Sequence, residues 1–396
     1  MRLTSEQLQE VMKKNGVDRI YSWSKIDTFI NSPYEYFLKY VLHKKEDIAN
    51  SAYPVLGGIC HSIIEDYYNQ KIEYMDMEES FEDGWTTAID IADLKFDRND
   101  TAKNESIKNK YKENLIHFFE NHIPVGRNLA LEKFVAVKIG NYLIQGYIDA
   151  IYKDDYGVFH IIDWKTSTQY KGNALNEKCG QLVVYAIALH EAGIPWDKLK
   201  ICWNFLKYCN IEYQQKNGVT KTRSVERSKI GESLQSNAKI WLKECGYADQ
   251  IDDYLKELLD TNDINVLPDD VKAKYIITDC YVYPEITQKL IEKWENTIIS
   301  TIADIEAREK DYEETHNEKI FWDSEESVKA QSYYFANLCG YSGYLHKPYQ
   351  QYLEKLNAEK NGDNTFNGIG SGLQDNEATS GAKLEDEMDL SWLDSI

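Results

Sequence analysis

The segment VFHIIDWKTSTQY, residues 158–170, is an apolar run that ends in Asp163, Trp164 and Lys165. Side chains alternate along a strand, so Asp163 and Lys165 share one face and Trp164 takes the other. The preceding segment, QGYIDAI, carries Asp149 on a strand joined to this one by a short turn. The two carboxylates can converge, and their mutual repulsion would cost stability. The pattern therefore predicts a sheet whose strand ends hold two acids and a base.

A hard divalent cation would relieve that repulsion. Mg²⁺ prefers one or two carboxylates together with waters and phosphate oxygens. Lys165 beside such an ion could orient a water or stabilise negative charge that builds on a phosphate. The alternative is an ordinary ion pair at a strand end, because the Asp-x-Lys spacing also arises by chance.

Hydrophobic periodicity places this segment within a longer pattern. Residues 134–167 form three expected strands, joined by turns at IGN and KDDYG, and KLKICWNFLKY forms another. Ser22–Ser24 precede a helix that is interrupted near Pro33, and CGQLVVYAIALHEAG is a helix that follows the Asp-x-Lys strand. Residues 211–229 are expected to be a polar hairpin or loop, and residues 232–312 to be mostly helical.

Composition limits the function classes. The chain has 396 residues, is 42% hydrophobic and carries a formal net charge of −21, which argues against broad nonspecific binding to nucleic acid. No apolar run is long enough to span a membrane, and the N-terminal segment is too polar for a secretory signal. The 7 cysteines include no CxxC pair, which is typical of reduced thiols in a cytoplasm.

Two helices carry further candidates. Gln181 and Tyr185 are four residues apart, so they share one helical face, and both can hold a phosphate or a base edge. The alternative for Tyr185 is core packing. His61 begins a helix just after Gly57 and Gly58, and the alternative for this histidine is a structural role.

Taken in order, these features resemble the PD-(D/E)XK nuclease superfamily and, within it, the RecB-like exonuclease branch. The resemblance runs from about residue 20 to 210 and more loosely to about 355. Its motifs are a Ser-rich helix entry with a Pro-aromatic pair in YSWSKIDTFINSPYEYFLKY, Gly57 to His61, Gly146 to Asp149, Asp163 with Lys165, and Gln181 with Tyr185. Glu132 also stands where such proteins often have a glutamate.

The resemblance implies a role for each residue. Asp149, Asp163 and the backbone carbonyl of Trp164 would bind Mg²⁺ or Mn²⁺, with His61 as an additional ligand. Lys165 would position or activate the attacking water. Catalysis would also involve Gln181 and Tyr185, which would hold the DNA strand.

The implied fold is α/β, a restriction-endonuclease-like central mixed sheet flanked by helices. We expect one elaborated nuclease domain over residues 1–360, with a helical cap inserted at about 66–128 and a helical region at about 232–358. Residues 361–396 are rich in Gly, Asn, Ser, Asp and Glu, which is typical of a disordered acidic tail.

The implied activity is that of a metal-dependent DNA exonuclease in replication, recombination or repair. Two alternatives remain open, a structure- or site-specific endonuclease on the same fold and a non-catalytic DNA-binding or scaffolding subunit. Compact members of this branch are frequent in bacteriophages, which would place the protein in a bacterial host cytoplasm.

Many relatives carry a four-cysteine iron–sulfur cluster. Here Ser32 precedes Pro33 at the first cysteine position, and the late segment SYYFANLCGYSGYLHKPYQQYL keeps only Cys339. Such clusters require four thiolates, so we expect no iron–sulfur cluster. Aromatic packing is expected in its place, by Tyr333, Tyr334, Phe335, Tyr341 and Tyr344.

Local basic patches could still contact DNA despite the net charge. Lys221, Arg223 and Arg227, with Lys229, lie on a polar segment beyond the sheet. The cap offers a second patch at Lys103, Lys108, Lys110 and Lys112. Both patches have the alternative of being ordinary solvated faces.

The end of the chain, residues 384–396, combines acids with an apolar stripe of Met388, Trp392 and Ile396. Such a segment could fold into a groove on a partner, for example a helicase, an annealing protein, a clamp or a single-strand-binding protein. The alternative is an inert remnant.

Overall fold

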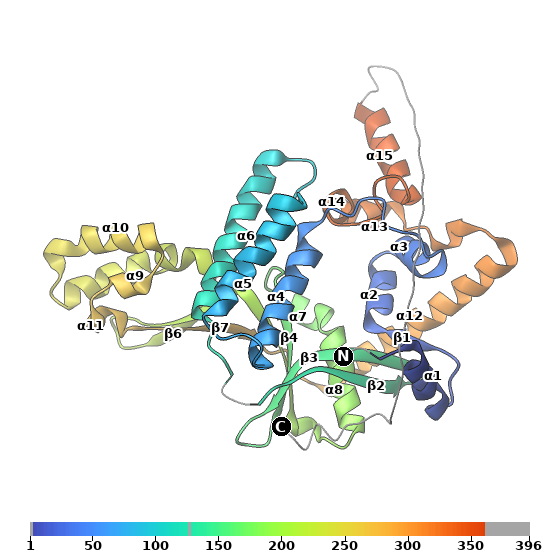
Figure 1. Ribbon diagram of the computed structural model, residues 1–396, viewed down its shortest axis with the longest axis horizontal. Helices are drawn as coiled ribbons and strands as arrows, with labels where there is room; N and C mark the ends of the chain where they lie inside the picture. Colours follow the sequence, from blue (N-terminus) through green and yellow to red (C-terminus); the bar gives the residue numbers. More distant parts are fainter. Residues whose placement is uncertain (1–2, 126–127, 361–396) are drawn as a thin grey trace.

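The computed structural model describes residues 3–125 and 128–360, so the predicted tail lies outside the described residues (Figure 1). Its centre is one seven-stranded sheet along the path β1-β3-β4-β5-β6, with β2 paired to β3 and β7 paired to β5. Parallel pairs join β1 to β3 and β4 to β5, and the other pairs are antiparallel. The strands are β1 (Ile20–Ser22), β2 (Ala130–Ile139), β3 (Tyr142–Lys153), β4 (Phe159–Lys165), β5 (Leu199–Gln214), β6 (Thr220–Glu226) and β7 (Tyr275–Val282).

The sheet has helices on both faces, which confirms the expected α/β class (Figure 1). Helices α4 (Ala52–Tyr68), α5 (Asp76–Trp85) and α6 (Thr101–Asn121) bury one core against Ile162, Trp164 and Cys202 of the sheet. Helices α8 (Gly180–Glu191) and α12 (Gln288–Thr315) bury a second core against Ile161 and Ile201. The alternation of β4 side chains between these cores is what the sequence predicts.

The sheet divides along β3. β2 pairs with one edge of β3. The opposite edge of β3 pairs with β1 at residues 143–145 and with β4 at residues 150–153. Residues 146–149, which include Asp149, therefore lie in a gap between β1 and β4.

The sheet divides again along β5. β7 follows one edge, and the opposite edge receives β4 up to Phe205 and β6 from Tyr208 onward. Leu206 and Lys207 lie in this second gap. Beyond it, β5, β6 and β7 extend into an arm with its own core, covered by α9 (Ile230–Glu244), α10 (Ile251–Thr261) and α11 (Asp269–Lys272) (Figure 1).

The remaining helices cover the arm, the N-terminus and the C-terminal region. They are α1 (Ser5–Lys14), α2 (Trp23–Asn31), α3 (Pro33–Tyr36), α7 (Ala174–Lys178), α9 (Ile230–Glu244), α10 (Ile251–Thr261), α11 (Asp269–Lys272), α13 (Glu325–Ala330), α14 (Ser332–Asn337) and α15 (Lys347–Lys360). Short helical turns are η1 (Phe37–Val41), η2 (Thr86–Ile91), η3 (Trp196–Lys198), η4 (Arg227–Lys229), η5 (Ala248–Gln250), η6 (Ile264–Val266) and η7 (Glu318–Phe321). No helix within the described ranges is both long and apolar enough to cross a membrane.

Local signals in the sequence account for several of these boundaries. The Ser22 hydroxyl accepts a hydrogen bond from the Lys25 amide and begins α2, as expected for an N-cap. Pro33 begins α3 after a break at Ser32, and residues 211–226 form the expected hairpin. β7 was not expected, because residues 232–312 were predicted to be mostly helical.

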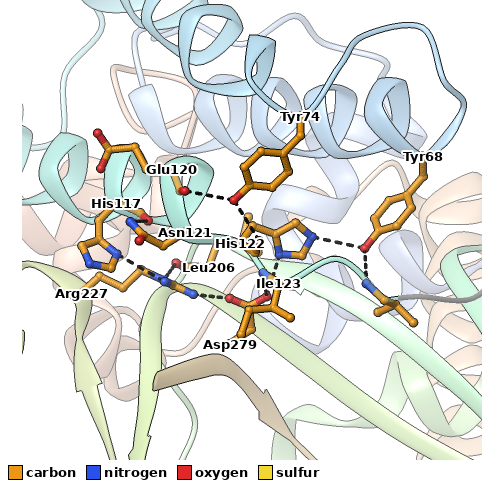
Figure 2. A network of polar contacts seen from close by, with 11 residues as sticks. Tyr68, Tyr74, His117, Glu120, Asn121, His122, Ile123, Leu206, Arg227 and Asp279 are labelled. Carbon is orange, nitrogen blue, oxygen red and sulfur yellow. Dashed lines mark hydrogen bonds and ion pairs between the residues drawn. The ribbon is translucent and has the colours of Figure 1, made fainter. Parts of the chain in front are cut away.

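A buried polar network ties α4 and the end of α6 to the arm (Figure 2). His122 Nδ1, just after α6, lies 2.6 Å from Asp279 Oδ2 on β7, and Arg227 Nη2 of η4 donates to Asp279 Oδ1. The Tyr68 hydroxyl of α4 lies 3.2 Å from His122 Nε2 and accepts a hydrogen bond from the Val125 amide. Burial alone would raise the pKa of Asp279, but hydrogen bonding and charge from His122 and Arg227 hold it below its ordinary value.

We predict that Asp279→Asn destabilises the protein by about 3 to 5 kcal/mol, because it leaves the Arg227 charge buried and unpaired. Urea unfolding measures this change. Since the folded pKa of Asp279 is lowered, its contribution is present above about pH 4 and is lost as pH falls through the folded pKa. The variant should therefore lose less stability than the wild type on acidification.

The matched control is Asp304→Asn, which removes an exposed carboxylate from a pair with Arg308 within α12. It should change the urea midpoint much less. Equal effects of the two substitutions would contradict a structural role for the Asp279 network.

Candidate active site

The β3–β4 register brings two carboxylates together. Ala150 pairs with Ile162, so the same register places Asp149 directly opposite Asp163. Both are buried, with residue exposures of 8% and 1%. Asp149 Oδ2 accepts a hydrogen bond from the Trp164 amide at 3.1 Å. Burial, and then the charge of Asp163, raise the pKa of Asp149 well above its ordinary value.

Lys165 neutralises the second carboxylate. Its Nζ lies 2.7 Å from Oδ2 and 3.0 Å from Oδ1 of Asp163, on the face of β4 that the strand pattern predicts. Burial lowers the pKa of Lys165, but Asp163 and Asp149 more than compensate and raise it above its ordinary value. Lys165 is therefore a charged hydrogen-bond donor in this arrangement.

His61 reaches the same place from the opposite face of the sheet. Its Nε2 lies 2.8 Å from the Trp164 carbonyl oxygen, and its Nδ1 lies 3.6 Å from Asp149 Oδ2. Burial lowers the pKa of His61, which favours the neutral imidazole that a metal ligand requires. The structure thus brings together all four groups predicted as ligands.

Glu132 adds a third carboxylate to the neighbourhood. Leu131 pairs with Ala150 and Lys133 with Ile148, so Glu132 of β2 stands across from Asp149 on the other edge of β3. Its φ is +48°, a left-handed backbone that is uncommon for a residue other than glycine. Strain of this kind is often found at functional sites.

Gly146 and Tyr185 are packed against each other. A Cβ added at Gly146 would lie 2.4 Å from Tyr185 Cε1, so only glycine fits beneath the ring. Gln181 Nε2 donates to the Tyr185 hydroxyl at 2.9 Å, which confirms that the two share a helical face. Tyr185 is 2% exposed, as expected for the alternative that its ring packs in the core.

The donor set suits a hard divalent cation. Carboxylates and a carbonyl are the oxygen ligands that Mg²⁺ and Mn²⁺ prefer, and Mn²⁺ also accepts imidazole. Within the described ranges, however, no three His, Cys, Asp or Glu side chains already stand in a metal-holding arrangement. The Lys165 ammonium group is bonded to the Asp163 carboxylate, and His61 contacts the Trp164 carbonyl oxygen. These residues are of the types that bind such an ion. For the ion to bind, the two contacts must open.

The three basic residues expected to bind DNA lie apart from the carboxylates. Lys221 and Arg223 are on β6 of the arm, where Arg223 lies over the Tyr213 ring. The expectation that Arg227 faces DNA is wrong in this structure, because Arg227 is buried and bonds Asp279 and the Leu206 carbonyl. No local pattern indicated this burial, since Asp279 is 52 positions away.

The four lysines of α6 that were expected to form a basic patch are each paired with a carboxylate. Four ion pairs account for them: Lys103 with Asp97, Lys108 with Glu105, Lys110 with Glu226, and Lys112 with Glu82. Their positive charge is largely compensated on the protein itself.

A hydrogen-bonded cluster surrounds Ser32 and the segment that holds Cys339. The Ser32 hydroxyl donates to Asp323 at 2.8 Å and lies 3.2 Å from His346 Nε2. Cys339 Sγ lies 3.6 Å from Glu35 Oε2. All seven cysteines are free thiols.

The aromatic packing predicted for this segment holds only in part. Phe335 and Tyr341 are buried, and Phe335 stacks on Tyr349. Tyr333 and Tyr344 are exposed instead. Tyr334 is half-buried, and its hydroxyl donates a hydrogen bond to Glu35 Oε2 at 2.7 Å.

Residues 20–319 match the family model of the PD-(D/E)XK nuclease superfamily. A search of curated proteins found no match. The matched range contains every predicted ligand together with Lys165, Gln181 and Tyr185.

We predict that Gly146→Ala forces Tyr185 away from Gln181 and destabilises the protein by about 1 to 3 kcal/mol, the usual effect of overpacking a core. Chemical denaturation measures the change. Gly58→Ala is the matched control, because Gly58 lies within helix α4 with no neighbouring atom within 4 Å of an added Cβ. It should leave stability unchanged or raise it. A Gly146→Ala protein as stable as the wild type would show that the close packing is not required.

Proposed function

The chain belongs to the PD-(D/E)XK nuclease superfamily, and from that premise we propose that it is a divalent-metal-dependent deoxyribonuclease that degrades DNA from its ends. The observation that carries the proposal is the convergence of Asp149, Asp163 and Lys165 at the gap in the sheet. Buried like charges of this kind persist where a bound cation or a reaction needs them.

Asp149, Asp163, the Trp164 carbonyl and His61 would hold Mg²⁺ or Mn²⁺. When bound, the ion would supply Lewis acidity that lowers the pKa of a water and offsets phosphate charge. The lowered pKa of His61 favours the neutral imidazole, which has one ring nitrogen free to bind an ion.

Lys165 would act as a donor. Its raised pKa keeps a proton on Nζ, so this nitrogen can orient a water or donate to an oxygen of the phosphate as negative charge grows. With Asp163 holding an ion, Lys165 would be free of its present partner and could face the substrate.

Tyr185 and Gln181 would hold the DNA strand. Gln181 donates to the Tyr185 hydroxyl oxygen, so the hydroxyl proton stays free to bind a phosphate oxygen. Burial raises the pKa of Tyr185, which keeps that proton in place.

Digestion from an end is favoured by the resemblance of the motif order to the RecB-like branch, and the same resemblance underlies our assignment to a bacteriophage and a bacterial cytoplasm. An endonuclease, or a scaffold without chemistry, would use the same fold. A helicase, an annealing protein, a clamp or a single-strand-binding protein remains our predicted partner for residues 384–396.

Incubation with linear and covalently closed circular DNA of the same sequence separates these functions. We expect the linear DNA alone to be degraded in Mg²⁺ or Mn²⁺, and neither form in EDTA. Degradation of the circle would identify an endonuclease. A protein that leaves both forms intact with either metal would contradict the proposal.

We predict that Lys165→Ala lowers the rate of digestion by about a thousandfold or more, because it removes the donor at the phosphate. Initial rates on end-labelled linear DNA measure this. Lys200→Ala is the matched control, since Lys200 is an exposed residue of β5 that pairs with His160 at the far end of β4. A Lys165→Ala protein that digests DNA nearly as fast as the Lys200→Ala protein would refute the assignment.

A further inference from the structure

Lys207 is a half-buried cation beside the candidate active site. It lies two residues beyond Phe205, which pairs with Lys165 in the β4–β5 register. It occupies the gap where β4 has ended and β6 has not yet begun to pair at Tyr208. Within the described part of the chain, no hydrogen bond or ion pair holds its ammonium group, which lies 4.6 Å from the centre of the Tyr111 ring.

The charges around Lys207 do not neutralise it. The nearby carboxylate of Glu226 pairs with Lys110 at 2.6 Å. Burial lowers the pKa of Lys207 to about 8, with Glu226 opposing this change and Lys110 adding to it. A partly desolvated cation without a partner costs stability, and such groups cluster at functional sites. The missing partner is therefore expected to be an anion.

The Tyr111 side chain, next to Lys207, carries a second polar group. The Tyr111 hydroxyl is buried beside Thr166 without a hydrogen bond of normal geometry. Thr166 directly follows Lys165, and a Cβ added at Gly57 of α4 would lie 3.5 Å from its Oγ1. Gly58 has nothing within 4 Å of an added Cβ. Gly57 thus packs against Thr166 without a side chain of its own, and Gly58 leaves open space beside α4.

We propose that Lys207, with Thr166 and Tyr111 beneath it, binds a backbone phosphate of the DNA next to the phosphodiester held at Asp163 and Lys165. The proposal rests on the nuclease function proposed above. An ammonium group suits a phosphate as a point charge. The link to the candidate site is Thr166, which directly follows Lys165 and whose Oγ1 lies against Gly57 of α4, the helix that also carries His61.

Lys207→Met tests the proposal, because the methionine keeps an apolar stem over Tyr111 and removes only the charge. Binding is measured by fluorescence anisotropy of a labelled DNA duplex with Ca²⁺ in place of Mg²⁺, over a series of salt concentrations. We expect the affinity for DNA to fall about three- to tenfold. The slope of log affinity against log salt concentration should decrease in magnitude by about one, since about one ion fewer is released on binding. Turnover with Mg²⁺ should show a raised KM and an unchanged kcat.

Thermal unfolding separates a binding role from a structural one. Removing an unpaired cation should leave the unfolding midpoint unchanged or raise it by about 1 to 2 °C. Lys274→Met is the matched control, because Lys274 also lies 4.6 Å from an aromatic ring, that of Trp241 in the arm. Its loss should leave DNA affinity and its salt dependence unchanged.

The pH dependence gives an independent readout. The charge of Lys207 should fade as pH rises from about 7 to about 9, so wild-type affinity should fall over this range. Lys207→Arg keeps its charge and should lose less affinity.

Three results would overturn the subsite. One is a Lys207→Met protein that still cuts DNA and binds it with the affinity and salt dependence of the wild type. This result would leave the proposed nuclease function unaffected. Another is a loss of affinity matched by a lowered unfolding midpoint, which would make Lys207 structural. A wild-type protein that neither binds nor cuts DNA would overturn the subsite and the proposed function together.

Discussion

Two buried carboxylates face each other across neighbouring strands, and the rest of the site depends on that constraint. The register of β3 and β4 fixes Asp149 opposite Asp163, and both side chains are buried. Without a cation at this point, the charge is offset by Lys165 and by a raised pKa of Asp149. The site is therefore held in a state that a divalent ion would stabilise.

The surrounding fold keeps this point open and supports it. The gap between β1 and β4 leaves residues 146–149 without a strand on one edge. Gly146 lets Tyr185 close against that gap, and α4 brings His61 to the Trp164 carbonyl. A second gap on β5 holds Lys207. The buried network around Asp279 joins the arm to the end of α6 (Figure 2).

The sequence predicts the parts of this structure that depend on local patterns. Strands β2 to β4 follow from alternation and from turns at Gly140 and Gly157, both with positive φ. The alternation also predicts that Asp163 and Lys165 share a face. The helix starts at Ser22 and Pro33 follow from N-cap chemistry.

Long-range pairing explains what the sequence did not predict. β7 lies between helices, and its partner β5 is about seventy positions earlier in the chain. Arg227 is buried because Asp279 comes to it through β7, so its polar surroundings in the sequence were misleading. The contact of His61 with Trp164 spans 103 positions and was expected only through family resemblance.

The central claim is that Asp149 and Asp163 are held together for a divalent cation. The most direct measurement is the thermal unfolding midpoint of the wild type and Asp149→Asn, with and without Mn²⁺, using Asp154→Asn as a control because Asp154 pairs with His160 away from the site. In metal-free buffer Asp149→Asn should unfold at a higher temperature than the wild type, because it removes the repulsion. Mn²⁺ should raise the midpoint of the wild type and of Asp154→Asn, and leave Asp149→Asn nearly unchanged. An equal response of all three proteins to Mn²⁺, or no response of the wild type, would contradict the account.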